Sequence, residues 1–182
     1  MTMIRAGLYG LCVADALGVP AESRTREDLR RNPITEMVGG GLHQQPAGYW
    51  SEDSSMTLCL ADSIGKVGYY HTHDIMARFD DWCRNGAYTP GGKKFDIYSG
   101  GYVVETMETV LWALMNTDNY RDCVLTCVNM GYDADSTAAI AGGLAGLYYG
   151  YDSIPREWVD GLVNKELIEA CIKGMEEYVN EL

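Results

Sequence analysis

Apolar residues recur at helical spacing along most of the chain. From Ile4 to Leu17 they alternate with small residues, which predicts a buried helix in close contact with neighbouring backbone. Similar stripes predict helices at about 54–67, 75–83, 103–114 and 120–128, and amphipathic segments at 155–162 and 166–179. Clusters of glycine, proline and polar residues predict loops at 23–50 and 86–101. The pattern therefore predicts an all-α fold.

A run of small residues follows position 137. It comprises Ala138, Ala139, Ala141, Gly142, Gly143, Ala145 and Gly146. Because these residues have little or no side chain, they predict a helix whose backbone lies very close to a partner element. The whole chain of 182 residues is interpreted as a single domain, 1–182, which is long enough to bury roughly two thirds of its extended surface.

The formal net charge of −12 limits the classes of partner. Nucleic acids and anionic membranes would be repelled at long range, so we expect no general binding to either. Asp15 interrupts the apolar N-terminal stretch, and we expect no membrane span. Six cysteines occur without a Cys-x-x-Cys pair, which predicts free thiols and a reducing, cytoplasmic location.

Two short acidic clusters carry the candidate chemistry. They occupy residues 51–55 (SEDSS) and 133–137 (DADST), and each follows a loop and opens a predicted helix. Carboxylates mixed with hydroxyl groups are the oxygen ligands that a hard divalent cation prefers. Helix capping alone is the competing interpretation, because Ser and Asp are common N-caps. An EF-hand is excluded, since Ala138 and Leu144 occupy the positions that require Gly and Glu.

Four separated segments form an ordered series. They are 10–18 (GLCVADALG) followed by Glu22, then 48–57 (GYWSEDSSMT), 99–106 (SGGYVVET) with the Leu-Trp pair at 111–112, and 131–137 (GYDADST). In this order they resemble the ADP-ribosylglycohydrolase family. The similarity covers nearly the whole chain, and its specificity comes from the agreement of separate motifs.

The resemblance implies a compact orthogonal bundle of helices that hydrolyses the bond between C1″ of ADP-ribose and a modified protein or other acceptor. It implies two Mg²⁺ ions, with Mn²⁺ as an alternative. The metal ligands it implies are Ser51, Glu52, Asp53, Asp133, Asp135 and Ser136. Glu52, Asp53 and Glu22 are the implied catalytic residues, and Glu22, Gly131 and Tyr132 the implied ligand contacts.

Two features depart from the family pattern. Glu52 stands where the family has Asp, and a carboxylate misplaced by about 1 Å can cost about 100-fold in rate. A central section, which would approach the ligand's phosphates, is absent near 97–100. These departures leave two other interpretations open. One is a catalytically impaired ADP-ribose-binding or regulatory module, and the other is a metal-stabilised interaction protein without a nucleotide ligand.

The missing section also bears on partners. Loss of helices would expose apolar faces, so a homodimer is a further hypothesis, with ordinary core packing of the aromatic rings as its rival. The rings considered for that interface are Trp82, Trp112, Tyr148 and Tyr149. The histidines do not have metal-binding spacing, and we expect His43, His71 and His73 to be exposed loop residues.

Overall fold

Helices form nearly all the regular structure of residues 2–92 and 103–180, the parts of the chain that the computed structural model describes. They are α1 (Met3–Gly18), α2 (Arg26–Arg31), α3 (Glu52–Val67), α4 (Thr72–Asn85), α5 (Val103–Asn116), α6 (Tyr120–Val128), α7 (Ala134–Tyr149), α8 (Arg156–Gly161) and α9 (Lys165–Asn180), with short 3-10 turns η1 (Val19–Ala21) and η2 (Tyr151–Ser153). Within these ranges, extended pairing is limited to one isolated bridge between Gly40 and Gln45. The all-α prediction is confirmed.

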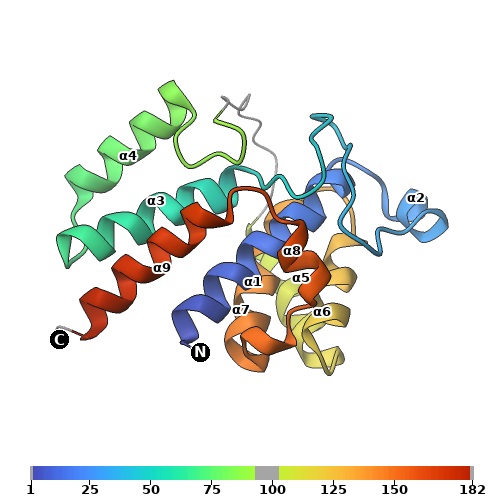
Figure 1. Ribbon diagram of the computed structural model, residues 1–182. Coiled ribbons are helices and arrows are strands. Elements are labelled where there is room, and N and C mark those ends of the chain that lie inside the picture. Colours follow the sequence, from blue (N-terminus) through green and yellow to red (C-terminus); the bar gives the residue numbers. More distant parts are fainter. Residues whose placement is uncertain (1, 93–102, 181–182) are drawn as a thin grey trace.

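Helices α1 and α7 form the centre of the molecule and lie antiparallel (Figure 1). A Cβ added to Gly10 would lie 2.3 Å from the Gly142 carbonyl oxygen, and one added to Gly146 would lie 2.2 Å from the Ala6 carbonyl oxygen. Side chains cannot be accommodated at such separations, so the glycines allow the two backbones to touch. The close helix contact expected from the small-residue run is confirmed.

Helices α3, α4 and α9 pack on one side of this central pair (Figure 1). Gly65 of α3 faces Gly174 of α9, and a Cβ on Gly65 would lie 2.7 Å from the Gly174 carbonyl carbon. Helix α4 covers the outer face of α3 and ends at Gly86, whose left-handed conformation closes the helix. This layer holds the helix that begins with the first acidic cluster.

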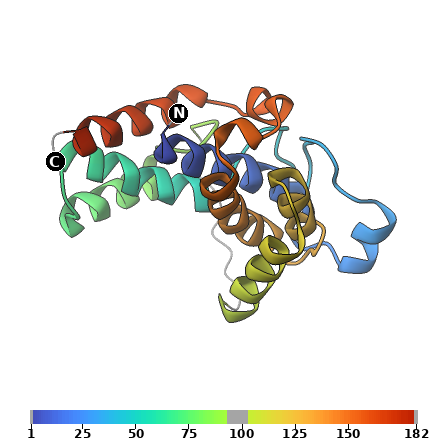
Figure 2. The same cartoon turned by 90° about the horizontal axis from the view of Figure 1, so that it is seen from below.

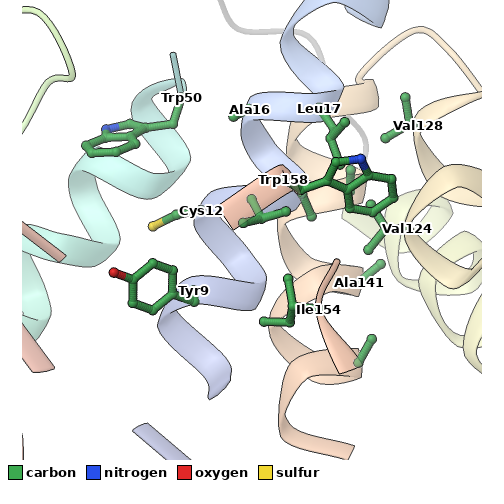
Figure 3. Close-up of a cluster of buried hydrophobic side chains, with 14 of the residues drawn as sticks. Tyr9, Cys12, Ala16, Leu17, Trp50, Val124, Val128, Ala141, Ile154 and Trp158 are labelled. Atoms are coloured by element: carbon green, nitrogen blue, oxygen red, sulfur yellow. The ribbon is translucent and has the colours of Figure 1, made fainter. Parts of the chain in front are cut away.

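Helices α5 and α6 pack against the other side of α7, and α5 extends away from the bundle in Figure 2. Figure 3 shows the core between these layers, where Trp158 of α8 lies near Leu17 and Val124. The ring of Tyr120 lies 6.4 Å from that of Trp158, and its hydroxyl donates to the carbonyl of Gly10. One continuous core therefore joins α1, α6, α7 and α8.

Several expectations about elements were wrong in detail. The segment 23–50 contains the short helix α2, whose N-cap Thr25 accepts a hydrogen bond from the N–H of Asp28. Helix α3 begins at Glu52 rather than near Ser54, because Ser51 supplies its cap. His71 caps α4 through Nδ1, so it is not a free loop residue. Residues 93–102 lie outside the described ranges, as does the predicted junction near 97–100.

Burial bears on the cysteines and on the apolar N-terminal stretch. All six cysteines are free, and five of them are buried, with Cys83 exposed. The stretch Met3–Ala21 is long and apolar enough for a membrane span by length and composition, but 67% of its window is buried inside the fold. In this structure it is a core helix, packed against α7.

Candidate active site

The first acidic cluster lies at the N-terminus of α3 and is held there by Ser51. The Ser51 Oγ accepts the N–H of Asp53 at 3.2 Å, which caps the helix, and it lies 3.3 Å from Asp53 Oδ2. Ser55 Oγ donates to the Ser51 carbonyl at 2.9 Å. The capping interpretation is therefore correct for Ser51. The carboxylates of Glu52 and Asp53 lie in the first turn of α3, where the helix dipole favours negative charge.

Asp15, inside α1, anchors this cluster from behind. It is fully buried, and its carboxylate accepts the N–H groups of Ser51 at 3.0 Å and Ser54 at 3.0 Å, together with the Ser54 hydroxyl. Burial, followed by the charge of nearby Asp53, raises the pKa of Asp15 to about 7, although these hydrogen bonds oppose the rise. The acid that interrupts the apolar stretch of α1 is thus what fixes α3 to the central helix.

The second cluster opens α7 and meets the first. Ser136 Oγ donates to Asp53 Oδ2 at 3.0 Å, so the two clusters, far apart in sequence, touch through one carboxylate oxygen. Asp133 occupies the N-cap position without making a side-chain capping bond. Capping alone therefore does not account for Asp133, whereas Asp135 Oδ1 accepts the N–H of Ser136 at 3.0 Å.

A backbone clasp places Glu22 beside the second cluster. The Tyr132 N–H donates to the Arg24 carbonyl at 2.9 Å, and the Ser23 N–H donates to the Tyr132 carbonyl at 2.7 Å. Gly131 has a φ of +76°, and a Cβ there would lie 2.3 Å from the Arg24 carbonyl oxygen. Only glycine fits this position without displacement. The clasp joins the end of the first motif to the start of α7.

The carboxylates influence one another strongly. Burial, followed by the charges of Asp15, Glu22 and Asp53, raises the pKa of Asp135 to about 9. Burial is also the first cause of the raised pKa values of Glu22, Glu52 and Asp53, followed by repulsion from neighbouring acids. These clustered acids have little positive charge near them, which favours binding of a cation.

The one basic side chain that approaches these acids closely in the described ranges is His43. Its Nε2 lies 3.5 Å from Glu22 Oε2, and this proximity lowers the pKa of Glu22 against the effect of burial. His43 is exposed, as expected, but the expectation that it is merely a loop residue missed its position against Glu22. The segment that carries it is shaped by the bridge between Gly40 and Gln45.

Comparison with known proteins identifies the family. The sequence profile described as ADP-ribosylglycohydrolase matches residues 2–100 and 93–181, which together span nearly the whole chain. The chain belongs to the ADP-ribosylglycohydrolase family. A solved structure titled "ADP-ribosylglycohydrolase-related protein complex" shares its fold, with a TM-score of 0.78 over 96% of this chain and 98% of that chain, at 21% identity.

Two curated relatives align with this chain over shorter stretches. An ADP-ribosylarginine hydrolase of Serratia proteamaculans is 50% identical over 76 residues, which are 42% of this chain and 21% of that protein. The ADP-ribosyl-[dinitrogen reductase] glycohydrolase of Rhodospirillum rubrum is 46% identical over 71 residues, 37% of this chain and 24% of that protein. If 76 residues are 21% of the first relative, its length is about 360 residues, roughly twice this chain.

The donor chemistry of the two acidic clusters fits a hard cation. Two hydroxyl groups converge on the Asp53 carboxylate, and burial together with the neighbouring acids raises its pKa. Within residues 2–92 and 103–180, no three or more His, Cys, Asp or Glu side chains form a group that could hold a metal ion by themselves. Mg²⁺ typically keeps several waters and takes only one or two carboxylates, so it does not require a full protein cage.

Most of the residues expected in the site are brought together. Ser51 and Asp53 contact each other, Ser136 contacts Asp53, and the charges of Glu22 and Asp53 add to burial in raising the pKa of Asp135. Gly131 and Tyr132 form the clasp, where their backbone has a structural role, and Tyr132 is exposed. Sequence reasoning missed the role of Asp15 and Ser54, although a charge inside an apolar helix was a usable signal.

Proposed function

We propose that this chain is a Mg²⁺-dependent hydrolase that removes ADP-ribose from a modified acceptor by cleaving the bond to C1″. The observation that carries the proposal is the contact between Ser136 and Asp53, which joins the two acidic clusters into one oxygen-rich site. Membership of the ADP-ribosylglycohydrolase family gives the chemical context. The raised pKa values of the acids support a cation as the missing partner of this cluster.

The residues that would hold two Mg²⁺ ions, or Mn²⁺, are those of the two clusters. They are Ser51, Glu52 and Asp53 from the start of α3, and Asp133, Asp135 and Ser136 from the start of α7. When bound, the metal supplies positive charge that orients the ribose hydroxyls and lowers the pKa of a bound water. The carboxylates of the site then become ionised, because the charge that opposed their ionisation is offset.

Asp53 is the best-placed carboxylate to act on the attacking water. Its Oδ2 is fixed by the hydroxyls of Ser51 and Ser136, while among the described residues Oδ1 accepts no hydrogen bond. The raised pKa of Asp53 makes it a stronger base than an exposed Asp. In the proposed step the bond between C1″ and the acceptor breaks and the water oxygen bonds to C1″. The water proton passes to the Asp53 carboxylate and from there to the leaving atom of the acceptor, so the carboxylate is regenerated.

Glu52 and Glu22 are proposed to assist at the same site. Each feels the charge of Asp133 and of His43, which places them around one shared space. Glu22 is held in place by the clasp between Ser23 and Tyr132, so its carboxylate approaches the second cluster from the α1 side. Glu22, Gly131 and Tyr132 are the proposed ligand contacts at this edge.

The acceptor is proposed to be an ADP-ribosylated protein, with arginine tested first. A cationic guanidinium would be favoured near several carboxylates, and the relative from Serratia proteamaculans carries the name ADP-ribosylarginine hydrolase. That relative is matched over about a fifth of its length, so its acceptor is a starting point for the test.

The test measures release of free ADP-ribose from an arginine-ADP-ribosylated protein. Parallel reactions contain Mg²⁺ or EDTA, and chromatography quantifies the released ADP-ribose. We expect release only with metal, and a loss of at least about 100-fold in Asp53→Asn, the range expected for removal of a general base. Asp152→Asn is the matched control, since Asp152 is exposed on η2, away from the site. No release from arginine, serine or nucleobase acceptors, with metal binding verified by calorimetry, would overturn the proposal.

Glu52→Asp separates turnover from binding. A hydrogen bond between the Glu52 carboxylate and its own backbone N–H lowers the pKa of Glu52, which opposes the effect of burial. Glu has one methylene more than Asp, so the substitution changes the position of the carboxylate. If the wild-type chain binds ADP-ribose without turnover and only Glu52→Asp gains activity, the chain is a binding or regulatory module. Robust turnover by the wild type excludes that alternative.

A further inference from the structure

Helix α5 carries apolar residues on nearly all sides. Its inner face buries Val110 and Ala113 against the core, as a helix of an ordinary bundle does. Its outer face carries a second stripe at Val103, Met107, Leu111 and Met115, spaced by four residues, and all four are exposed. A helix that is apolar all round is normally buried on all sides. The outer face of α5 therefore lacks the cover that its sequence predicts.

This exposed surface is large for a monomer. Trp112 of α5 and Tyr148 of α7 extend the stripe, and the six side chains are between 37% and 84% exposed. At about 200 Å² for a large side chain, they present roughly 700 Å² of apolar residue surface. The largest apolar patch of a typical monomer is about 300–600 Å², whereas a stable interface buries about 800 Å² per partner. The outer face of α5 has the size of an interface.

The exposed outer face of α5 lies next to the point in the sequence where a central section is predicted to be absent. The two segments that match the family profile meet at residues 93–100, immediately before α5, and one relative is about twice as long as this chain. Helix α5 also projects from the bundle in Figure 2. A hollow lined by Met115, Leu144 and Tyr148 continues the apolar surface onto α7.

Charged side chains border the same face and are self-complementary. Arg26 and Arg30, one turn apart on α2, line a hollow with Glu108 and Trp112, and Glu105 lies on the same side of α5. Within the described residues, none of these four charged groups forms an ion pair. Two positive and two negative charges leave the face locally neutral in a chain of net charge −12. A second copy would not be repelled here, and its arginines could meet these glutamates.

We propose that the outer face of α5, with Tyr148 and the border of Arg26, Arg30, Glu105 and Glu108, is the interface at which two copies of this chain associate. The four-residue spacing of the stripe forms a ridge of the kind that packs against a second helix. The presence of both signs of charge on one face favours an identical partner over another polypeptide, because a two-fold arrangement can place the arginines of each copy opposite the glutamates of the other. Of the rings first considered for such an interface, Trp82 is buried and Tyr149 is half-buried, so only Trp112 and Tyr148 belong to it.

The first test is the molar mass of the purified full chain, by light scattering and analytical ultracentrifugation over a dilution series. We expect a dimer, and a rise of at least about tenfold in the dissociation constant for Leu111→Glu and for Met115→Glu. Met76→Glu is the matched control, because Met76 is an apolar residue that is 60% exposed on the distant helix α4. A wild-type monomer at all concentrations, or equal weakening by Met76→Glu, would overturn the proposal.

The second test distinguishes a second copy from any other occupant. One chain carries Arg26→Glu and Arg30→Glu, and the other carries Glu105→Arg and Glu108→Arg. We expect each variant alone to dimerise more weakly than the wild type, and their equimolar mixture to recover a dimer of mixed composition. Circular dichroism verifies that both variants are folded. Two folded variants that dimerise as well as the wild type, or a mixture that stays monomeric, would contradict pairing between copies.

Discussion

The contact between α1 and α7 can be tested by adding a single methyl group. In Gly142→Ala the new Cβ would lie 2.3 Å from both the Gly10 carbonyl oxygen and the Ala14 Cβ. Non-bonded carbon atoms prefer separations of about 3.5–4.0 Å, so the helices would have to separate by more than 1 Å. Neither obstacle can rotate aside, because one is backbone and the other is attached directly to it.

The neighbouring glycine gives a matched control. In Gly143→Ala the new Cβ would meet Leu11 Cβ at 3.6 Å, an ordinary contact, so this variant gains only the higher helix propensity of Ala. That gain is about 1 kcal/mol. Overpacking costs about 1–3 kcal/mol, and the backbone contact at Gly142 places it at the upper end. We therefore expect Gly142→Ala to lose about 2 kcal/mol net and Gly143→Ala to gain up to about 1 kcal/mol.

The assay is equilibrium unfolding in urea, supported by thermal melting. For a chain of this size, 1 kcal/mol corresponds to a shift of about 2–4 °C, so the melting temperatures of the two variants should differ by about 6–12 °C. The α1–α7 contact also sets the separation of the two acidic clusters, so Gly142→Ala should weaken metal binding as well. Equal stabilities for the two variants, or a more stable Gly142→Ala, would refute the close helix contact.

Three further predictions concern the acids and the clasp. Asp15→Asn replaces one acceptor oxygen with a donor facing the N–H groups of α3, and should cost about 1–3 kcal/mol in urea unfolding; an unchanged stability would contradict the anchoring role. Asp135 binds a proton more tightly in the folded state, where its pKa is about 9. In the absence of metal, the free energy of unfolding should therefore fall as the pH rises from about 4 to 9. Asp135→Asn should flatten this slope in thermal melts recorded in EDTA. A slope of opposite sign would disprove the raised pKa. Gly131→Ala combines a positive φ with a 2.3 Å contact and should cost more than 1 kcal/mol by thermal melting, unlike Gly143→Ala.

Local pattern was sufficient for much of the fold. The alternation of small and apolar residues in α1, and the small residues of α7, predicted that these helices lie very close to a partner, and Gly10 and Gly142 touch in the structure. The placement of both acidic clusters at helix starts was also predictable, because a polar loop preceded each stripe. Their meeting was inferred from chemistry and resemblance rather than from periodicity.

Other features depend on tertiary contacts that a single sequence does not reveal. Asp15 is an acid inside an apolar helix, and its burial is tolerated only because the N-terminus of α3 supplies N–H donors from 36 to 39 residues away. Helix α2 was missed because six residues bounded by polar caps carry too little periodicity. Trp82 and Trp112 both lie in apolar stripes of predicted helices, so the sequence does not distinguish them. Tertiary packing decides that Trp82 is buried and Trp112 is exposed.

The glycine contacts between α1 and α7 hold the acids of the site close together. Burial of Asp15, Asp53 and Asp135, followed by repulsion from neighbouring acids, raises their pKa values, which means that the folded state resists having all of them ionised. Packing of α1 against α7 fixes the second cluster, and the Asp15 bonds fix the first, so the acids cannot relieve their repulsion by moving apart. A divalent cation relieves it without movement. Since its binding must then displace protons, affinity for Mg²⁺ should increase with pH over the range where stability without metal declines.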